Sequence, residues 1–250
     1  MPCSAMIKKS IDFLIALAIY GLLALYIALS YPGRNNFNLA RLLPSSSEIL
    51  NAWFLTLYIS LVALVLSFVA GLILYYITQS KNGVLRNMGI IFDEVVFGSP
   101  LLVFVIAVFY FIAFPLGIKD RLNVGILAFT LYMAPYMKSM VVGAIKAIDP
   151  TQFQAMRVLG FTPAQQFIHI LFPQLLRIMF PPLIGNFSFI IKGSSLLAVI
   201  GVRELYGTID RIQANSLLYV EGYLLMFVTY LIMTIPLMAI SRWIERKISA

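Results

Sequence analysis

Long runs of apolar residues, separated by short polar segments, dominate the pattern along this chain. An α-helix needs about 20 consecutive apolar residues to cross the hydrocarbon core of a bilayer. The runs lie at 11–30, 52–77, 95–114, 123–145, 183–200 and 217–240. Each is near or above that length, and the shortest, 183–200, contains Lys192. The pattern therefore predicts an all-α fold, a polytopic membrane helical bundle of about six transmembrane helices.

The first run follows Lys8 and Lys9, an arrangement that also occurs in secretory signal peptides. Such a peptide would end here near Ala28-Leu29-Ser30. The apolar run is longer than the roughly 7–15 residues typical of a signal peptide, so we expect an uncleaved first helix. Residues 1–50 are thus interpreted as an extra N-terminal transmembrane helix with an outer linker. Residues 51–245 are interpreted as a transmembrane domain.

A capping pattern precedes the second predicted helix. In Pro44-Ser45-Ser46-Ser47-Glu48 a serine stands three residues before a glutamate. In a capping box these two side chains satisfy each other's backbone amides, which have no partner within the helix. We therefore expect Ser45 to be the N-cap of this helix and Glu48 to complete the box.

Composition and charge agree with a membrane protein. The chain is 61% hydrophobic and 11% charged, its mean hydropathy is +0.94, and soluble domains carry about 25% charged residues. The net charge of +8 raises the possibility of a nucleic-acid partner. However, the basic residues border the apolar runs and form no continuous stripe, so we expect contact with membrane lipid and no nucleic acid.

The same basic residues predict an orientation. With both termini in the cytosol, ten basic residues fall inside and six outside, which is the sign of the positive-inside rule. The inside set is Lys8, Lys9, Lys81, Arg86, Lys146, Arg157, Arg177, Arg242, Arg246 and Lys247, and the outside set is Arg34, Arg41, Lys119, Arg121, Arg203 and Arg211.

The longest inside segment, 146–182, carries signals of ordered structure. Asp149-Pro150-Thr151-Gln152 and Thr162-Pro163-Ala164-Gln165 each combine an N-cap residue, a proline at the first helical position and a glutamine at the third. Gly160 lies where a left-handed residue would end the first helix. We expect two short helices, 150–159 and 163–171, joined by a tight turn at Gly160 and Phe161. We also expect Pro173 and Pro181-Pro182 to break the chain before the next span.

The first of these short helices carries Phe153, Met156 and Leu159 on one face. An apolar face needs a cover. From the residues alone, packing on the protein's own membrane domain, burial at the lipid interface and docking onto a partner protein remain equally open.

Catalytic and metal-binding patterns are missing from the sequence. No G-x-x-x-x-G-K-[ST] phosphate loop occurs, so we expect no ATP or other cofactor in this chain. A single histidine, His169, and a single cysteine, Cys3, supply neither a metal site, an intrachain disulfide nor a nucleophile–base pair. We therefore do not expect an enzyme.

Three motifs resemble those of known transporters. Ala155, Leu159-Gly160-Phe161 and Leu171-Phe172-Pro173-Gln174 resemble the signature loop of importer-type ABC permeases. Gly98-Ser99-Pro100-Leu101-Leu102-Val103 is similar to the G-T-P-L-L-V run of the polar amino acid permease family. So is Ile191-Lys192-Gly193-Ser194-Ser195-Leu196, which is followed by Val199-Ile200-Gly201-Val202 and Glu204-Leu205. The resemblance covers roughly 50–245.

The resemblance implies the partners and the coupling residues. Such a permease sits in a bacterial cytoplasmic membrane and pairs with a second copy or a sister permease. It engages two cytosolic ATPases, which hold ATP and magnesium, and an outer solute-binding protein. The loop 146–182 is then the ATPase-coupling loop, and its implied contact residues are Gln154, Ala155, Met156, Arg157, Leu159, Gly160, Phe161 and Pro173.

The translocation path implied by the resemblance contains Lys192, Gly193, Ser194, Ser195, Ser99 and Ser139. This sequence departs from the family at Gln154 (Glu in the family), Met156 (Ala) and Phe97 (Arg). Gly193 and Ser139 stand where the family has acids. Lys192 either faces the path or snorkels to the interface, with the serines bonded to their own helix. Without an acid nearby, the path is expected to prefer a neutral or anionic solute over arginine or lysine.

Together these features predict the permease subunit of an ABC importer that carries a polar amino acid. One alternative is the same machine carrying another small solute, such as a peptide fragment or an organic ion. Another is a proton-coupled carrier or a membrane enzyme, which should show paired acids or histidines within the spans.

Overall fold

The computed structural model describes residues 15–16, 18–23, 26, 30 and 37–248, and its described part contains helices and no strand. The chain divides into two compact units, Met1–Leu43 and Pro44–Ala250; η2 includes residues of both, and all elements from α2 onward belong to the second unit. The helices, in chain order, are η2 (Leu39–Ser45), α2 (Ser46–Thr78), α3 (Gly83–Gly98), α4 (Leu101–Ala107), η3 (Val108–Ala113), α5 (Arg121–Lys146), α6 (Pro150–Val158), α7 (Pro163–Gln165), η4 (Gln166–Leu171), α8 (Phe172–Gly193), η5 (Ser194–Ile200), α9 (Leu205–Ser216) and α10 (Tyr219–Ile248).

Four helical segments are long and apolar enough to cross a membrane. They are Leu39–Thr78, Arg121–Lys146, Pro163–Ile200 and Tyr219–Lys247, and Leu101–Ala113 is a shorter apolar helix. The predicted all-α membrane bundle is therefore confirmed. The runs 52–77, 123–145 and 183–200 fall within the first three segments, and the run 217–240 begins two residues before the fourth. The predicted helix 11–30 lies largely outside the described residues.

The predicted single span at 95–114 is wrong. The chain forms α3 up to Gly98 and starts α4 at Leu101, with Ser99 and Pro100 both extended at a ψ of 136°. A proline disfavours helical geometry in the residue before it and has no amide hydrogen of its own. The break therefore occurs at the Ser99-Pro100 pair that the sequence places inside the apolar run.

The core lies where α2 and α5 cross. Phe129, Met133 and Met137 of α5 are fully buried against Ile59 and Ala63 of α2. The two backbones approach closely because Gly71 of α2 has no side chain: a Cβ there would lie 2.5 Å from the Met137 Cβ and 2.9 Å from the Ala134 carbonyl oxygen. Small residues permit this kind of crossing in membrane bundles.

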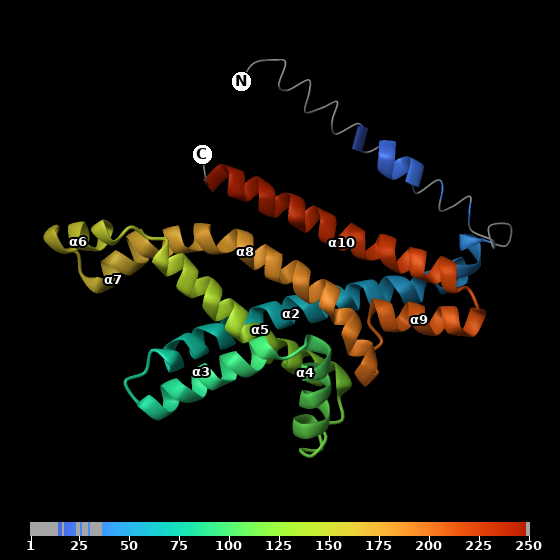
Figure 1. Ribbon diagram of the computed structural model, residues 1–250, viewed down its shortest axis with the longest axis horizontal. Helices are drawn as coiled ribbons and strands as arrows, with labels where there is room; N and C mark the ends of the chain where they lie inside the picture. Colours follow the sequence, from blue (N-terminus) through green and yellow to red (C-terminus); the bar gives the residue numbers. More distant parts are fainter. Residues whose placement is uncertain (1–14, 17, 24–25, 27–29, 31–36, 249–250) are drawn as a thin grey trace. The chain divides into compact units, whose positions relative to one another are not determined.

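The remaining helices surround this crossing (Figure 1). α8 packs on α5 and α10, α9 packs on α10 and α2, and α3 packs on α2 and α5. α6 and α7 extend beyond the start of α8, at the end of this unit opposite to α9. Large apolar side chains such as Tyr58, Val65, Phe227 and Ile232 point outward and are more than half exposed, as expected of surfaces that face lipid or another membrane subunit.

The expectation that Pro181-Pro182 breaks the chain is also wrong, since both prolines lie inside the continuous helix α8. Prolines at these positions remove the amide donors for the Arg177 and Ile178 carbonyls one turn earlier, and membrane helices tolerate such interior prolines. The Ser241 hydroxyl of α10 donates to the Pro181 carbonyl at 3.3 Å and ties α10 to this part of α8. The expected break at Pro173 is wrong as well, because Pro173 lies within the continuous helical segment Pro163–Gly193, two residues after the π-helical turn η4.

The predicted capping box at Ser45 and Glu48 does not form. Ser45 precedes α2, but its side chain makes no capping hydrogen bond. The 3₁₀ turn η2 runs directly into α2, so the preceding turn is itself helical. The Glu48 carboxylate instead forms an ion pair with Arg211 of α9.

Candidate functional site

The two short helices beside the turn, α6 and α7, are each capped at the N-terminus. The Asp149 carboxylate accepts the Thr151 amide at 2.8 Å at the start of α6. Thr162 and Gln165 form a complete capping box at the start of α7. Both predicted N-caps are confirmed. The pKa of the Asp149 carboxyl lies below its usual range because its charged form accepts the backbone and side-chain hydrogen bonds of Thr151. This cap is thus complete at neutral pH and is lost as the pH falls through that lowered pKa.

Gly160 ends α6 in the left-handed conformation that the sequence predicted, with a φ of +74°. The Phe161 amide donates to the Met156 carbonyl at 3.1 Å, and the Gly160 amide donates to the Arg157 carbonyl at 3.1 Å. This pattern is a Schellman-type helix end. A Cβ at Gly160 would meet no atom within 4 Å, so the glycine is explained by the backbone angle and not by crowding.

The second predicted short helix does not end at residue 171. α7 continues through the π-helical turn η4 directly into α8, so Pro163–Gly193 is an unbroken helical segment. The Gln174 amide of α8 donates to the Gln152 side-chain oxygen of α6 at 3.0 Å and ties the two helices together.

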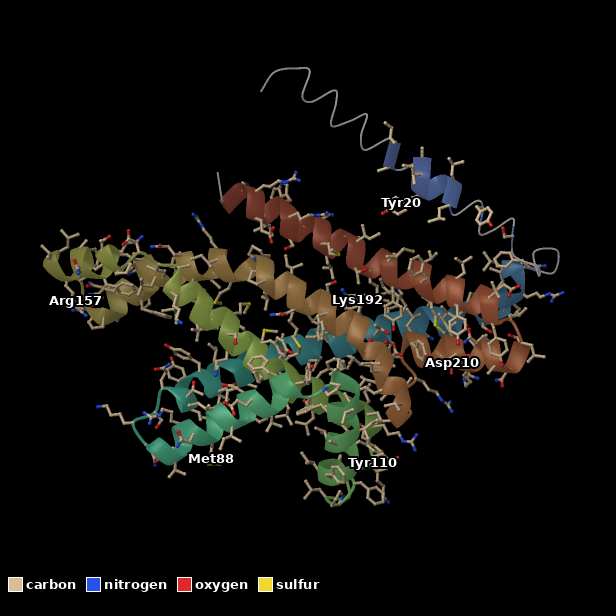
Figure 2. The ribbon with its side chains drawn as sticks, viewed as in Figure 1. Tyr20, Met88, Tyr110, Arg157, Lys192 and Asp210 are labelled. Atoms are coloured by element: carbon tan, nitrogen blue, oxygen red, sulfur yellow. The ribbon has the colours of Figure 1, made fainter. Side chains whose placement is uncertain are left out.

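The apolar face of α6 is divided between the interior and the surface. Met156 is buried, Phe153 is half-buried, and Leu159 is 72% exposed. Packing on the protein's own membrane domain therefore accounts for Met156 but leaves Leu159 uncovered. Val158, which the sequence reasoning missed, is 87% exposed beside it. Gln154, Ala155, Arg157 and Gly160 are exposed as well. Figure 2 shows Arg157 at this end of the protein.

The predicted path residues do not form a single cluster. Ser194 is buried and donates to the Ile191 carbonyl at 2.8 Å, and Ser195 donates to the Lys192 carbonyl at 2.9 Å. Both serines thus bond back to their own helix, as one of the sequence interpretations proposed. Lys192 is exposed near the C-terminal end of α8, where Figure 2 labels it. α8 ends at Gly193 and continues as the 3₁₀ turn η5, so the helix changes form there.

Ser99 and Ser139 lie in different surroundings. The Ser99 carbonyl accepts the Tyr132 hydroxyl at 3.3 Å at the junction of α3 and α4. Ser139 is exposed and lines a cavity of about 440 Å³ with Thr78, Gln79, Lys138, Val142, Gly143 and Lys146.

Aromatic side chains link the Ser99 region to α8. Tyr132 and Tyr136 stack at 5.7 Å, and Tyr136 stacks on Phe189 at 6.4 Å. Phe97 packs edge-on against Tyr136 at 5.1 Å. Phe97 and Phe189 are both partly exposed, and Phe189 stands one helical turn before Lys192 on α8. The result is a partly exposed surface of Phe97, Tyr136 and Phe189, which we call the aromatic surface, and Lys192 lies three residues beyond it on α8.

The structure buries the acids Asp93 and Glu204, to which the sequence analysis gave no site role. Asp93 of α3 forms an ion pair with Lys138 of α5, and both side chains are largely buried. Asp93 stands two residues before the apolar run 95–114 and was left outside it. The amphipathic pattern of residues 83–98 and the charge of Lys138 inside a span were the available signals.

Glu204 is the second such acid and is fully buried. Its carboxyl oxygens accept the Tyr230 hydroxyl at 2.8 Å, the Thr56 hydroxyl at 3.2 Å and the Gly207 amide at 3.0 Å. It thereby joins α9, α2 and α10. Its signal in the sequence was its place in the Glu204-Leu205 motif. No group of three or more metal-ligating side chains occurs among the residues that the structure describes.

Comparisons with known proteins agree with this architecture. The family model described as "Binding-protein-dependent transport system inner membrane component" matches residues 70–250. The probable glutamine ABC transporter permease protein GlnM of Bacillus subtilis (strain 168) is 29% identical over 212 residues, which cover 84% of this chain and 98% of that protein. The L-cystine transport system permease protein TcyB of the same organism is 28% identical over 203 residues, 77% of this chain and 86% of that protein.

A solved structure shares the fold. The crystal structure of an amino acid ABC transporter with histidines contains a chain that superposes with a TM-score of 0.76 at 24% identity. The match covers 84% of this chain and 99% of that chain.

Proposed function

The chain belongs to the family of binding-protein-dependent transport system inner membrane components, and from this premise we propose that it is the permease subunit of an importer for a polar amino acid. Members of this family are transporter subunits and not enzymes. The family also implies ATPase and substrate-binding partners. ATP and magnesium would be held by the ATPase subunits, and this chain would supply the path.

The observation that carries the proposal is the exposed tip formed by Val158, Leu159 and Gly160. The large apolar side chains of Val158 and Leu159 are exposed. They stand next to a turn between two helices, α6 and α7, whose N-termini are both capped. An exposed apolar patch on a rigid support is typical of a protein interface. We assign this tip, with Gln154, Ala155, Arg157, Phe161 and Pro173 around it, to contact with the ATPase subunit. The buried side chain of Met156 would hold α6, and with it the tip, in position.

The aromatic surface and Lys192 form the proposed translocation path. Lys192 offers a positive charge to a substrate carboxylate, and the partly exposed rings of Phe97 and Phe189 offer apolar contact. Asp93 is already paired with Lys138, so it is not available to neutralise a cationic side chain. A neutral or acidic amino acid is therefore preferred over arginine or lysine, because desolvating an unpaired charge is costly. The names of the relatives, which include glutamine and L-cystine systems, favour the amino acid class.

The assembly follows from the same reasoning. The bias of basic residues favours both termini in the cytosol, which puts the α6–α7 turn on the side of the ATPases. A second copy or a sister permease would complete the path, and closure of the ATPases would switch access between the two sides. The same architecture carrying a peptide fragment or an organic ion is the alternative.

Transport measurements test the proposal. The protein is reconstituted with its ATPase and binding protein, and ATP-dependent uptake of labelled glutamine, glutamate and arginine is compared. We expect uptake of glutamine or glutamate to exceed that of arginine, and Lys192→Ala to reduce it. Lys119→Ala, which removes an exposed lysine outside the aromatic surface, is the matched control. Strongest uptake of arginine with Lys192→Ala unaffected would refute the path, and uptake of none of these amino acids would favour the alternative solute.

A further inference from the structure

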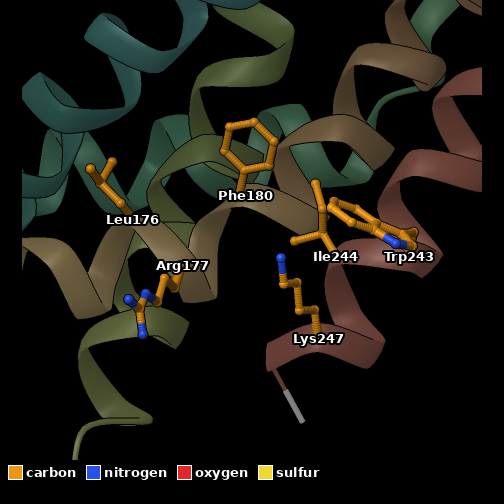
Figure 3. A pocket seen from close by; sticks show the side chains of 6 residues that line it. All are labelled: Leu176, Arg177, Phe180, Trp243, Ile244 and Lys247. Carbon is orange, nitrogen blue, oxygen red and sulfur yellow. The ribbon is translucent and has the colours of Figure 1, made fainter. Parts of the chain in front are cut away.

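A second cavity lies between α8 and the C-terminal end of α10. Its volume is about 540 Å³, and it is lined by Leu176, Arg177, Phe180, Trp243, Ile244 and Lys247. Figure 3 shows Phe180 of α8 near Trp243, Ile244 and Lys247 of α10, with Leu176 and Arg177 farther along α8. The lining has two chemical parts, an apolar wall of aliphatic and aromatic side chains and a pair of cations.

The two cations are not neutralised by the protein. The described residues form two ion pairs, Lys138–Asp93 and Arg211–Glu48, and neither Arg177 nor Lys247 belongs to them. The lining contains no acid. The nearby Glu245 accepts a hydrogen bond from Ser241 on its own helix and is not among the lining residues. A cavity lined by two unpaired cations and no acid is therefore suited to an anionic ligand.

The lining has the residue types that gather at a membrane surface. Lys247 is the last residue of the membrane-spanning segment of α10, and Arg177 lies in the second turn of α8. Trp243 belongs to a residue type that gathers at membrane–water interfaces. The Lys247 amine lies 5.1 Å from the centre of the Trp243 ring, a cation–π contact that holds the amine beside the opening.

We propose that this cavity binds an anionic phospholipid, with its phosphate between Arg177 and Lys247 and its acyl chains along Leu176, Phe180 and Ile244. A free phosphate has the same charged group as the lipid headgroup, but it has no acyl chain that could contact the apolar wall. Basic pockets between membrane helices have the composition that recognises lipid phosphates. The proposal is independent of the transported solute and of the ATPase contact.

Tryptophan fluorescence tests the site directly. The chain has two tryptophans, so in Trp53→Phe protein Trp243 is the reporter. The full-length protein is reconstituted in bilayers that contain brominated phosphatidylglycerol or brominated phosphatidylcholine, since bromine quenches a ring in contact with the lipid. We expect the anionic lipid to be preferred at Trp243, and Arg177→Gln with Lys247→Gln to lower its apparent affinity by about fivefold for each residue replaced.

A matched pair of substitutions provides the control. Arg242 and Arg246 stand on the same turns of α10 but do not line the cavity, so Arg242→Gln with Arg246→Gln should preserve most of the preference. Inorganic phosphate should not displace the brominated lipid. Equal quenching by the two lipids, or equal losses in the two double variants, would overturn the proposal. Displacement by phosphate would assign the cavity to a soluble anion, and quenching by neither lipid would show that protein covers it; either result overturns the lipid site.

Discussion

Glu204 illustrates how much of this fold depends on single polar groups. Its carboxyl group accepts hydrogen bonds from α10, α2 and the start of α9, and the Leu205 amide donates to the Thr56 hydroxyl at 3.0 Å beside it. Glu204 is fully buried, so no water replaces a lost partner. Removal of this carboxyl group therefore leaves the Tyr230 hydroxyl and the Gly207 amide without this acceptor, while the Thr56 hydroxyl retains the Ala52 carbonyl at 3.0 Å.

Replacement of Glu204 by alanine should destabilise the protein strongly. The Tyr230 hydroxyl and the Gly207 amide lose their acceptor, and we expect a loss on the order of 3 kcal/mol in the free energy of unfolding. Glu204→Gln keeps one acceptor oxygen and should lose less. The measurement is the temperature at which the detergent-solubilised protein loses its monodisperse state. Glu94→Gln, at an exposed position on α3, is the control, and a Glu204→Ala protein as stable as this control would contradict the role.

The proposed contact of the Gly160 turn with the ATPase subunit can be tested by two substitutions whose side chains have nearly the same shape. Asparagine and aspartate both tolerate the left-handed region better than other residues do, and the structure leaves open space for a side chain. Gly160→Asp adds a charge at the apolar tip and should lower ATP-dependent uptake by tenfold or more (about 1.4 kcal/mol), while Gly160→Asn should retain most of it. Insertion of both variants is checked by their yield in the membrane. Normal uptake by Gly160→Asp would remove this turn from the ATPase contact.

At the scale of the elements, the crossing of α2 and α5 requires a residue without a side chain at position 71. Gly71→Leu would force a side chain into the Met137 Cβ and the backbone of α5, and overpacking of this kind costs about 1–3 kcal/mol. We expect a lower melting temperature and weaker expression in the membrane. Gly143→Leu is the control, because a Cβ at that position of α5 meets no atom within 4 Å. Equal effects of the two substitutions would show that the close approach is unimportant.

The elements that the sequence predicted well are those defined by local signals. Asp149, Thr162 and Gly160 act within four residues of the backbone groups that they satisfy, so their roles follow from the pattern alone. The errors arise where a distant partner decides. The Glu48 carboxylate pairs with Arg211 of α9 and does not complete the predicted cap, and the Asp93 carboxylate is buried because it pairs with Lys138 of α5. The pattern around Glu48 or around Asp93 does not identify a partner that is distant in the sequence.

At the scale of the whole molecule, the orientation in the membrane can be measured. In a Cys3→Ser background, a cysteine at Asn215 of α9 should react with an impermeant thiol reagent added to intact cells, and a cysteine at Ala164 of α7 should not. Both positions are exposed, so access depends on the side of the membrane. Both cysteines should react after the cells are opened. Labelling of Ala164 but not Asn215 in intact cells would invert the proposed topology.

The unbroken helical segment from Pro163 to Gly193 has a mechanical meaning. At 1.5 Å per residue such a rod is roughly 45 Å long, and it joins the turn at Gly160 to Lys192. A tilt of about 10° about one end would sweep the other through roughly 8 Å, given that length. The π-helical turn η4 and the prolines Pro173, Pro181 and Pro182 are the places where such a rod can bend. Gly201, whose left-handed φ of +84° follows η5, is a further joint beyond its end. A movement of the tip would therefore reach Lys192 through the bends within the segment, and Gly201 would let the chain after it keep its place.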